Sequence, residues 1–386
     1  MQTGDFGGAE RLQIDYFKSI NFDKYSVTFG VNIDIFSHIF NKNNLPVKLV
    51  YLPVLHQEDR FTIKFFKYYK FFNTIKPECI IFNQFWLKSF SLPEVIAAFL
   101  ITNGNVYMIV HDCPPVCPKN KGKKYFGFMP GLGLSWRKDR LLQTLLGYFT
   151  KNTLAVSNAT RDSLIKLHKF PSYNVKRVYH GVDIEDNVPS VENRIKLRKE
   201  LNISDSDKII VSTAMLYQGK RLDRLVEAFA VVAQERNDAQ LIIVGSGSEY
   251  SKLLDMVNSS DEDIKRRIRF LGFREDIPAF LQLSDIFVLP SDSEGLPLAC
   301  LEAMSCGLIS IVTNCGGPVE IIKDGSNGFL VEKSCEGVTN GIKRALNLNS
   351  EEKRWISHNA RKFVEQRFDL KKNIHSGLRL LKIGDG

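Results

Sequence analysis

Two carboxylates, Glu294 and Glu302, frame the stretch of this sequence whose residue types could do chemistry. The apolar run 286–289 before them predicts a buried strand, and the loop that contains Glu294 follows its carboxyl end. Open α/β sheets bind ligands at that end of their strands, and the free N–H groups of the next helix attract anions. We therefore expect Glu294 to face sugar hydroxyls beside a phosphate, and Glu302 to hold a vicinal diol such as a ribose. The alternative for either residue alone is a solvent-exposed carboxylate.

A strand–loop–helix–strand unit must position these two carboxylates. Pro297 suits the first helical position, because its fixed φ fits a helix and its missing N–H is not needed there. The helix carries Glu302 between its first and second turns, and Gly307 ends it. A second apolar run, 308–312, predicts the next buried strand and leads into a turn with two glycines.

The stretch 284–324 resembles the retaining glycosyltransferases of family 4. Its two glutamates, with seven residues between them, stand in S-E-G-x-P-x-x-x-L-E-A-M-x-x-G, and G-G-P-x-E-I-I-x-D-G-x-N-G-x-L-V follows. The resemblance covers nearly the whole chain and is strongest over 211–331. It implies the GT-B fold, in which two Rossmann-like α/β domains face an interdomain cleft, and a nucleotide-diphosphate sugar as the donor substrate.

The same resemblance implies roles for individual residues. Lys220 matches the family's diphosphate-binding lysine, whereas Met215 stands at the position of the family's arginine and Arg221 replaces a common glycine. We expect either Arg221 to join Lys220 at the diphosphate or Lys220 to act alone while Arg221 begins a solvated helix face. His111 ends the predicted strand 106–110 and is expected to face the donor sugar, so that Glu294, His111 and Lys220 are the expected catalytic residues. Further residues expected at the donor, besides Glu302 and Arg221, are Gly8, Gly245, Phe273, Gly295, Leu296, Pro297 and Leu298.

The alternation of apolar and helical stretches predicts the domain organisation. Apolar runs at 25–31, 47–51, 79–82, 106–110, 153–157, 175–179, 208–213 and 240–244 predict further strands of parallel α/β sheets. We expect an acceptor-binding N-terminal domain over 1–183, a linker over 184–206, a nucleotide-sugar-binding domain over 207–365 and a C-terminal helix, 366–386, that crosses back to the first domain. The resemblance implies a strand before Gly8, but MQTGDF has no apolar run, so the chain is truncated there or a neighbouring element substitutes.

Composition and cysteine usage argue against a membrane-spanning, a secreted or a disulfide-rich protein. With 44% hydrophobic and 25% charged residues among 386, the chain has the composition of a soluble globular protein. It has no apolar run of membrane-spanning length and no signal-peptide character at its start, and its seven cysteines lack a framework spacing, so we expect a cytoplasmic protein. His111, Cys113 and Cys117 could suggest a metal, but two prolines between the thiols and the lack of a fourth ligand favour free thiols. We expect neither a metal nor a cofactor.

The positive charge of the chain is concentrated in its first half. Residues 1–180 carry 24 Lys and Arg against 12 Asp and Glu, whereas 181–386 carry 28 against 31. This excess favours an anionic partner, such as a membrane surface or a lipid phosphate, over nucleic acid, which we do not expect to bind. At 100° per residue, one side of a helix over 60–73 holds Arg60, Lys64, Lys67 and Lys70, and the other holds Phe65, Phe66, Tyr69 and Phe72. The helix either packs on the core with a solvated basic face, or lies on the inner face of a membrane.

The sequence therefore predicts a retaining, metal-independent glycosyltransferase that moves a sugar from a nucleotide-diphosphate donor to a glycan, lipid-linked or other acceptor. One alternative is a non-catalytic GT-B scaffold that binds nucleotide or lipid, which Met215 and the missing first strand favour. Another is a GT-B nucleotide-sugar epimerase. An NAD-linked oxidoreductase is disfavoured, because Tyr250 occupies the place of the third glycine after Gly245 and Gly247.

Overall fold

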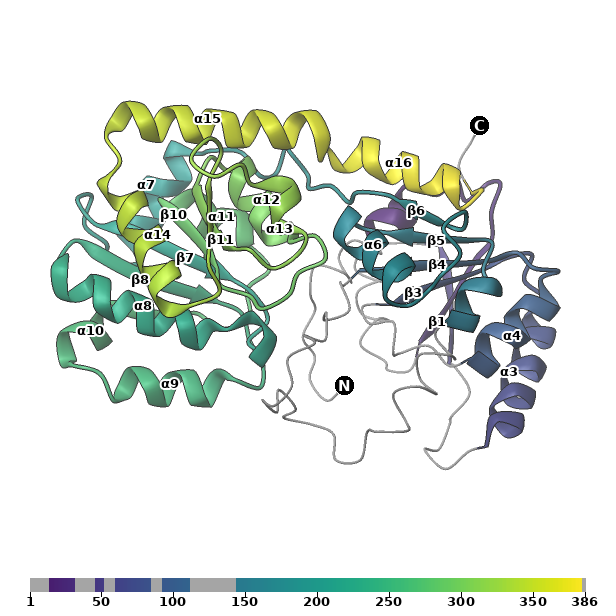
Figure 1. Ribbon diagram of the computed structural model, residues 1–386. Helices are drawn as coiled ribbons and strands as arrows, with labels where there is room; N and C mark the ends of the chain where they lie inside the picture. The colour runs from purple at the N-terminus through teal and green to yellow at the C-terminus, as the bar shows by residue number, and fades with distance from the viewer. Residues whose placement is uncertain (1–13, 32–45, 52–59, 85–91, 112–143, 384–386) are drawn as a thin grey trace. The chain divides into compact units, whose positions relative to one another are not determined.

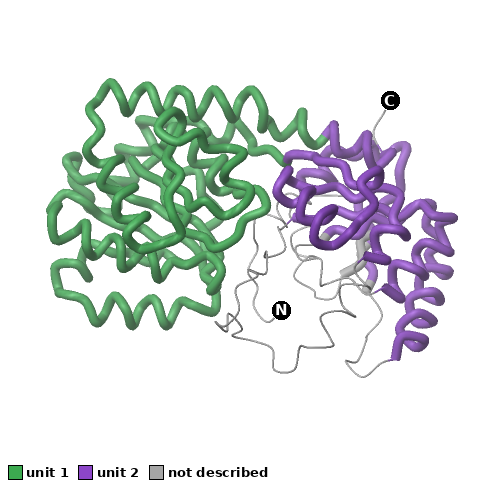
Figure 2. Tube along the Cα trace, viewed as in Figure 1, with its two compact units in different colours: residues 1–12, 180–374 green, residues 13–179, 375–386 purple. Residues whose placement is uncertain are grey.

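The computed structural model describes residues 14–31, 46–51, 60–84, 92–111 and 144–383 (Figure 1). These residues form two compact units, which Figure 2 shows in different colours. Unit 1 contains residues 180–374, and unit 2 contains the described residues of 13–179 together with 375–383. Both units are built on parallel sheets, which confirms the predicted α/β class.

Unit 1 contains a six-stranded parallel sheet in the order β12-β11-β10-β7-β8-β9. Its strands are β7 (Lys208–Thr213), β8 (Ala239–Val244), β9 (Ile268–Phe270), β10 (Ile286–Leu289), β11 (Ile309–Thr313) and β12 (Phe329–Val331). The central strands are buried along their whole length, as expected for a parallel sheet covered on both faces. The strand order reverses between β7 and β10, and a doubly wound sheet binds ligands outside the carboxyl ends of the strands at this point.

Helices cover both faces of this sheet (Figure 1). On one side α8 (Leu222–Glu235) packs against α9 (Tyr250–Asn258) and α14 (Cys335–Asn347), and on the other α11 (Ile277–Leu283) and α15 (Ser350–Arg367) pack against α12 (Leu298–Ser305). The shorter helices are η2 (Gln218–Lys220), α10 (Glu262–Arg266) and α13 (Pro318–Ile321). Phe229 and Val232 of α8 and Ile342 of α14 are completely buried against the sheet, so apolar burial holds these layers together.

The segment expected to be a linker, 184–206, contains helix α7 (Val191–Glu200), which packs on α11 within unit 1. The polar sequence of 184–206 does not indicate this packing, because α7 contacts the rest of unit 1 through arginine side chains. The Arg194 guanidinium lies 2.8 Å from the Asp285 carboxylate, and the buried Arg198 donates to the carbonyl oxygens of Ser204 and Asp207 at 2.6 Å each. The segment 184–206 therefore belongs to unit 1, which contains residues 180–374.

In unit 2 the described residues form a four-stranded parallel sheet and a separate parallel strand pair. The sheet has the order β3 (Ile80–Gln84), β4 (Val106–Val110), β5 (Asn152–Ala155) and β6 (Val175–Arg177), and the pair is β1 (Val27–Val31) and β2 (Val47–Tyr51). Its helices include α3 (Phe61–Ile75), α4 (Leu92–Ile101) and α6 (Asn158–Lys166). The last helix of the chain, α16 (Leu370–Leu380), begins in unit 1 and ends in unit 2, where Asn152 Nδ2 donates to the Leu380 carbonyl at 3.0 Å.

The helix predicted over 60–73 is α3, but its buried face differs from the predicted one. Tyr68 and Phe72 are buried, with their rings stacked at 5.7 Å, and α3 packs against α4. Phe66 and Tyr69, which were predicted on the apolar side, are 65% and 38% exposed. Packing against α4 selects one line of aromatic residues for the core, so the others remain in contact with water.

Candidate functional site

The loops that follow β7 and β10 are joined at the point where the strand order of unit 1 reverses. The backbone N–H of Asp292 donates to the carbonyl oxygen of Gly219 at 3.0 Å. Lys220 Nζ, in the first loop, donates to Glu294 Oε1, in the second, at 2.6 Å. The structure therefore brings together two of the predicted catalytic residues at the edge of the sheet where this fold binds ligands.

The Lys220–Glu294 ion pair is withdrawn from water. The two side chains are 13% and 8% exposed, and Glu294 Oε1 also accepts a hydrogen bond from Ser291 Oγ at 2.6 Å. The Lys220 ammonium lies 5.6 Å from the centre of the Tyr217 ring. A buried ion pair contributes little net stability, because removing two charges from water costs about as much as their attraction returns. Its position at a ligand-binding edge makes it a candidate functional pair.

The loop after β11 fixes the backbone of Glu294. The Glu294 N–H donates to the Cys315 carbonyl at 3.1 Å, and the Gly317 N–H donates to the Glu294 carbonyl at 2.9 Å. A Cβ on Gly317 would overlap the carbonyl oxygen of Gly295, so this close approach requires glycine. The glycine pair of the predicted turn thus holds the predicted carboxylate in place.

Helix α12 begins at Leu298, so Pro297 is its N-cap and not its first helical residue as predicted. Pro297 has φ −77° and ψ 94°, an extended conformation that brings the chain into the helix. Gly295, Leu296 and Pro297 are buried between Glu294 and the start of the helix. Glu302 lies one turn further on and is half-buried, and its charge adds to the effect of burial in raising the pKa of Cys306 to about 12.

Arg221 is held by two carboxylates and has an unusual backbone conformation. Its φ is +52°, which explains why a glycine suits this position. Its Nε donates to Asp223 Oδ1 at 3.0 Å, and its Nη1 donates to Asp292 Oδ2 at 3.2 Å. The hydrogen bond to Asp223 raises the pKa of Arg221 above its ordinary value. The Asp223 pKa is lowered by that same hydrogen bond, although burial acts in the opposite direction.

Sequence reasoning did not identify Arg224, Asp292 or Ser291 as parts of this cluster. Arg224 donates to the Pro290 carbonyl at 2.7 Å and to Asp292 Oδ1 at 2.9 Å, and its side chain is only 6% exposed. The local signal that could have identified Arg224 is its positive charge in the first turn of α8, where the helix dipole disfavours a cation.

Three glycines bring the loop after β7 against the neighbouring strand ends. Gly245 and Gly247 have φ values of +142° and +152°, and a Cβ on either would overlap the carbonyl oxygen of Ala214 or Leu216. The Gly245 N–H also donates to the Gly272 carbonyl at 2.8 Å. Gly245 therefore supports the loop that carries Met215, while Phe273, next to Gly272, is 45% exposed at the same strand end.

His111 lies in unit 2, directly after β4. It is buried, and its Nε2 is hydrogen-bonded to Asn83 Oδ1 on β3. Burial lowers its pKa from 6.5 to about 4, so the imidazole is neutral at pH 7. Gly8, Cys113 and Cys117 lie outside the described residues. Within the described ranges, no three His, Cys, Asp or Glu side chains gather as a metal site would require.

Comparison with known proteins identifies the part of the chain that contains this cluster. Residues 193–363 match the family model described as glycosyl transferases group 1. These residues are a group 1 glycosyltransferase domain. Lys220, Glu294 and Glu302 all lie within it. The predicted resemblance to glycosyltransferases is confirmed as one to group 1, whereas membership of family 4 stays a prediction.

Two curated relatives are similar in sequence to part of this chain. The N-acetyl-alpha-D-glucosaminyl L-malate synthase of Bacillus anthracis is 31% identical over 241 residues, 61% of each chain. The UDP-Gal:alpha-D-GlcNAc-diphosphoundecaprenol alpha-1,3-galactosyltransferase of Escherichia coli is 32% identical over 185 residues, 47% of this chain and 48% of the relative. The match spans about half to three fifths of the length of these relatives.

Solved structures share the fold along nearly the whole chain. HepE from Anabaena, in complex with UDP, superposes with a TM-score of 0.77 at 22% identity and covers 99% of this chain and 98% of its own. WaaG, a glycosyltransferase involved in lipopolysaccharide biosynthesis, gives a TM-score of 0.71 at 16% identity over 97% and 96% of the two chains. The chain has the GT-B fold, as predicted. In the described part of the chain, no helix is both long and apolar enough to cross a membrane.

Proposed function

We propose that this protein transfers a sugar from a nucleotide-diphosphate donor to a glycan or lipid-linked acceptor. The observation that carries the proposal is the buried Lys220–Glu294 pair, which lies at the strand reversal inside the group 1 domain. A diphosphate leaving group gains negative charge as the glycosyl bond breaks, so a cation directed at it stabilises the transition state more than the ground state. The proposed role of Lys220 is to supply that cation.

The proposed donor contacts divide between phosphate, ribose and sugar. Lys220 and the N–H groups that begin at Gly295 hold the diphosphate, and Glu302 holds the ribose. Glu294, already fixed by Ser291 and the loop after β11, holds the sugar. His111 is neutral and its Nε2–H is directed at Asn83 Oδ1, so its Nδ1 accepts a hydrogen bond from a sugar hydroxyl. The leaving phosphate takes the acceptor's proton.

The names of similar proteins indicate which donors to test first. HepE has been crystallised with UDP-glucose, and the Escherichia coli relative is named for UDP-Gal and a diphosphoundecaprenol acceptor. A relative from Corynebacterium glutamicum is GDP-mannose-dependent. Release of nucleoside diphosphate from UDP-glucose, UDP-galactose and GDP-mannose is the direct assay, with undecaprenyl-diphosphate sugars as acceptors. Nucleotide binding without turnover of any donor would favour the non-catalytic scaffold instead.

Retention of configuration and independence from metal ions are parts of the same proposal. Retention is implied by the family resemblance that the two glutamates, with seven residues between them, carry, and NMR of the anomeric proton in the first product tests it. Metal independence rests on the availability of Lys220 and helix N–H groups to offset the charge of the diphosphate. Loss of activity with EDTA that Mg²⁺ or Mn²⁺ restores would contradict it.

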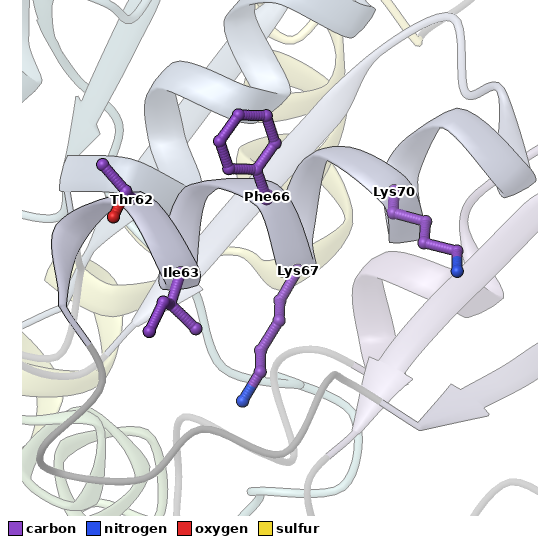
Figure 3. A pocket seen from close by; sticks show the side chains of 5 residues that line it. All are labelled: Thr62, Ile63, Phe66, Lys67 and Lys70. Carbon is purple, nitrogen blue, oxygen red and sulfur yellow. The ribbon is translucent and has the colours of Figure 1, made fainter.

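An anionic membrane surface is the proposed partner of unit 2, and the cytoplasmic face of a membrane is the proposed location of the protein. Five Lys or Arg residues and no Asp or Glu occur between Arg60 and Pro77. On α3, Thr62, Ile63, Phe66, Lys67 and Lys70 line a shallow surface hollow (Figure 3). Ile63 and Phe66 are 44% and 65% exposed, so apolar side chains accompany the lysines, as on helices that lie in a membrane interface.

A further inference from the structure

The guanidinium of Arg224 connects the two loops that carry the proposed catalytic pair. It extends from the first turn of α8 and donates to the Pro290 carbonyl at 2.7 Å and to Asp292 Oδ1 at 2.9 Å. Both acceptors belong to the loop after β10, whereas Lys220 lies only four residues before Arg224 in the chain. Arg224 therefore connects the structure around Lys220 to the loop that carries Glu294.

Local preferences do not account for an arginine at this position. Arg224 is the third residue of α8, where the helix dipole disfavours a positive charge, and its side chain is 6% exposed. Burying a guanidinium costs free energy unless hydrogen bonds replace its water. Residues that violate local rules in this way concentrate at functional sites.

The contacts around Arg224 continue to Glu294 through two residues. Asp292 accepts from Arg224 on one carboxylate oxygen and from Arg221 on the other, and its N–H donates to the Gly219 carbonyl. Ser291, between the two residues that Arg224 contacts, donates its hydroxyl to Glu294 Oε1 at 2.6 Å. Fixing residues 290 and 292 therefore fixes the hydroxyl that holds the Glu294 carboxylate.

We propose that Arg224 is a positioning residue of the donor site: it holds the loop after β10 so that Glu294 stays opposite Lys220. The inference rests on the proposed function, because Glu294 must act on the donor for its position to matter. A displacement of about 1 Å at a reacting group can cost two decades in rate, so loosening this loop lowers turnover without any contact between Arg224 and substrate.

A double-mutant cycle separates positioning from general stability. Arg224→Lys keeps the charge but loses the two-pronged contact, and we expect it to lower kcat for UDP-glucose, UDP-galactose or GDP-mannose about tenfold to a hundredfold. In a Glu294→Gln background the same change is expected to cost much less, since its effect passes through Glu294. Where Glu294→Gln turns over too slowly to measure, calorimetric affinities for UDP-glucose, UDP-galactose and GDP-mannose provide the same cycle, because these donors contain the sugar that Glu294 holds. Asp292→Asn, which removes the charge between the two arginines, is a second variant with the same expectation.

Arg198→Lys is the matched control. Arg198 is also a buried arginine that donates to backbone carbonyls of unit 1, but its contacts are to residues 204, 207 and 283. We expect this control to lower the Tm without changing kcat. Equal losses from Arg224→Lys in both backgrounds, or full turnover in Arg224→Lys, would overturn the positioning role. A wild-type protein that neither binds UDP or GDP nor turns over any of the three donors would instead refute the proposed function, and the inference with it.

Discussion

Replacing Arg221 by alanine and by glycine separates its backbone conformation from its charge. At φ +52° a residue with a Cβ pays about 1 kcal/mol relative to glycine. Both variants lose the contacts to Asp223 and Asp292, each worth about 0.2–1 kcal/mol because the Arg221 side chain is 29% exposed and Asp292 44%. Arg221→Gly is therefore expected to be about 1 kcal/mol more stable than Arg221→Ala, which corresponds to about 2–4 °C in Tm for a unit of this size.

The activity of the same two variants tests the charge. If the guanidinium contacts the diphosphate, both substitutions remove a hydrogen bond to a charged group, worth about 1.5–3 kcal/mol. Donor affinity and turnover then fall about tenfold to a hundredfold in both, whatever their Tm. Lys220→Ala is expected to lower turnover at least as much, with a separable loss on adding either Arg221 variant. Nucleoside-diphosphate release and thermal unfolding, measured on the same preparations, give both quantities.

Two results would refute this reasoning in different ways. Wild-type affinity and turnover in both Arg221 variants would mean that Arg221 only holds Asp223 and Asp292. Lys220 and the N–H groups at the start of α12 would then bind the diphosphate without it. Equal Tm values for the alanine and glycine variants would show that the backbone conformation carries no cost.

Three further predictions follow from the described side chains. Glu294→Gln and Glu302→Ala should each abolish most of the transfer while circular dichroism stays unchanged, and normal rates in either would remove that residue from the site. Binding to anionic vesicles should weaken with salt, which screens exposed charges beyond about 10 Å at 0.1 M, and should weaken further when Lys67 and Lys70 become Glu; equal binding to neutral vesicles would contradict it. Because the pKa of His111 is about 4 when folded and 6.5 when unfolded, it should lower stability by up to about 3 kcal/mol as pH falls through that interval. His111→Gln should flatten this slope in urea unfolding, and an unchanged slope would count against a buried neutral imidazole.

The strands at the proposed site were predictable because their sequences are nearly continuous apolar runs. The bounds 208–213, 286–289 and 106–110 agree with β7, β10 and β4 to the residue. Both faces of a parallel sheet are covered, so such a strand is apolar throughout and the polar loop at its carboxyl end marks where it stops. The positions of Lys220, Glu294 and His111 at strand ends follow from those bounds.

The contact between Lys220 and Glu294 could not be predicted in this way. The two residues are 74 positions apart in the chain, and they meet because β7 and β10 are neighbours in the sheet. Local patterns give the strands but not their order. Arg224 was missed for a related reason, because the periodicity of α8 places it on the side opposite Leu222 and Phe229 and does not indicate that the Pro290 carbonyl is there to accept from it.

The exposed face of α3 shows where periodicity fails altogether. Aromatic residues cover more than half of the circumference of this helix, so the sequence alone does not show which of them form the buried stripe. Contact with α4 decides that Tyr68 and Phe72 are buried and Phe66 is not. Of the two alternatives for this helix, packing on the core holds for Tyr68 and Phe72. Contact of the exposed side with a membrane stays a prediction.

The Lys220–Glu294 pair suggests how a buried cation can be kept ready for an anionic donor. An isolated ammonium at this depth would be costly, and Glu294 offsets its charge while no phosphate is bound. Lys220 is a point charge on a flexible chain, so it can move from the carboxylate to a phosphate without a change of backbone. Glu294 keeps its hydrogen bond from Ser291 and its two backbone contacts, and its carboxylate then becomes available to a sugar hydroxyl. One exchange of partners would thus prepare both residues for the roles proposed for them.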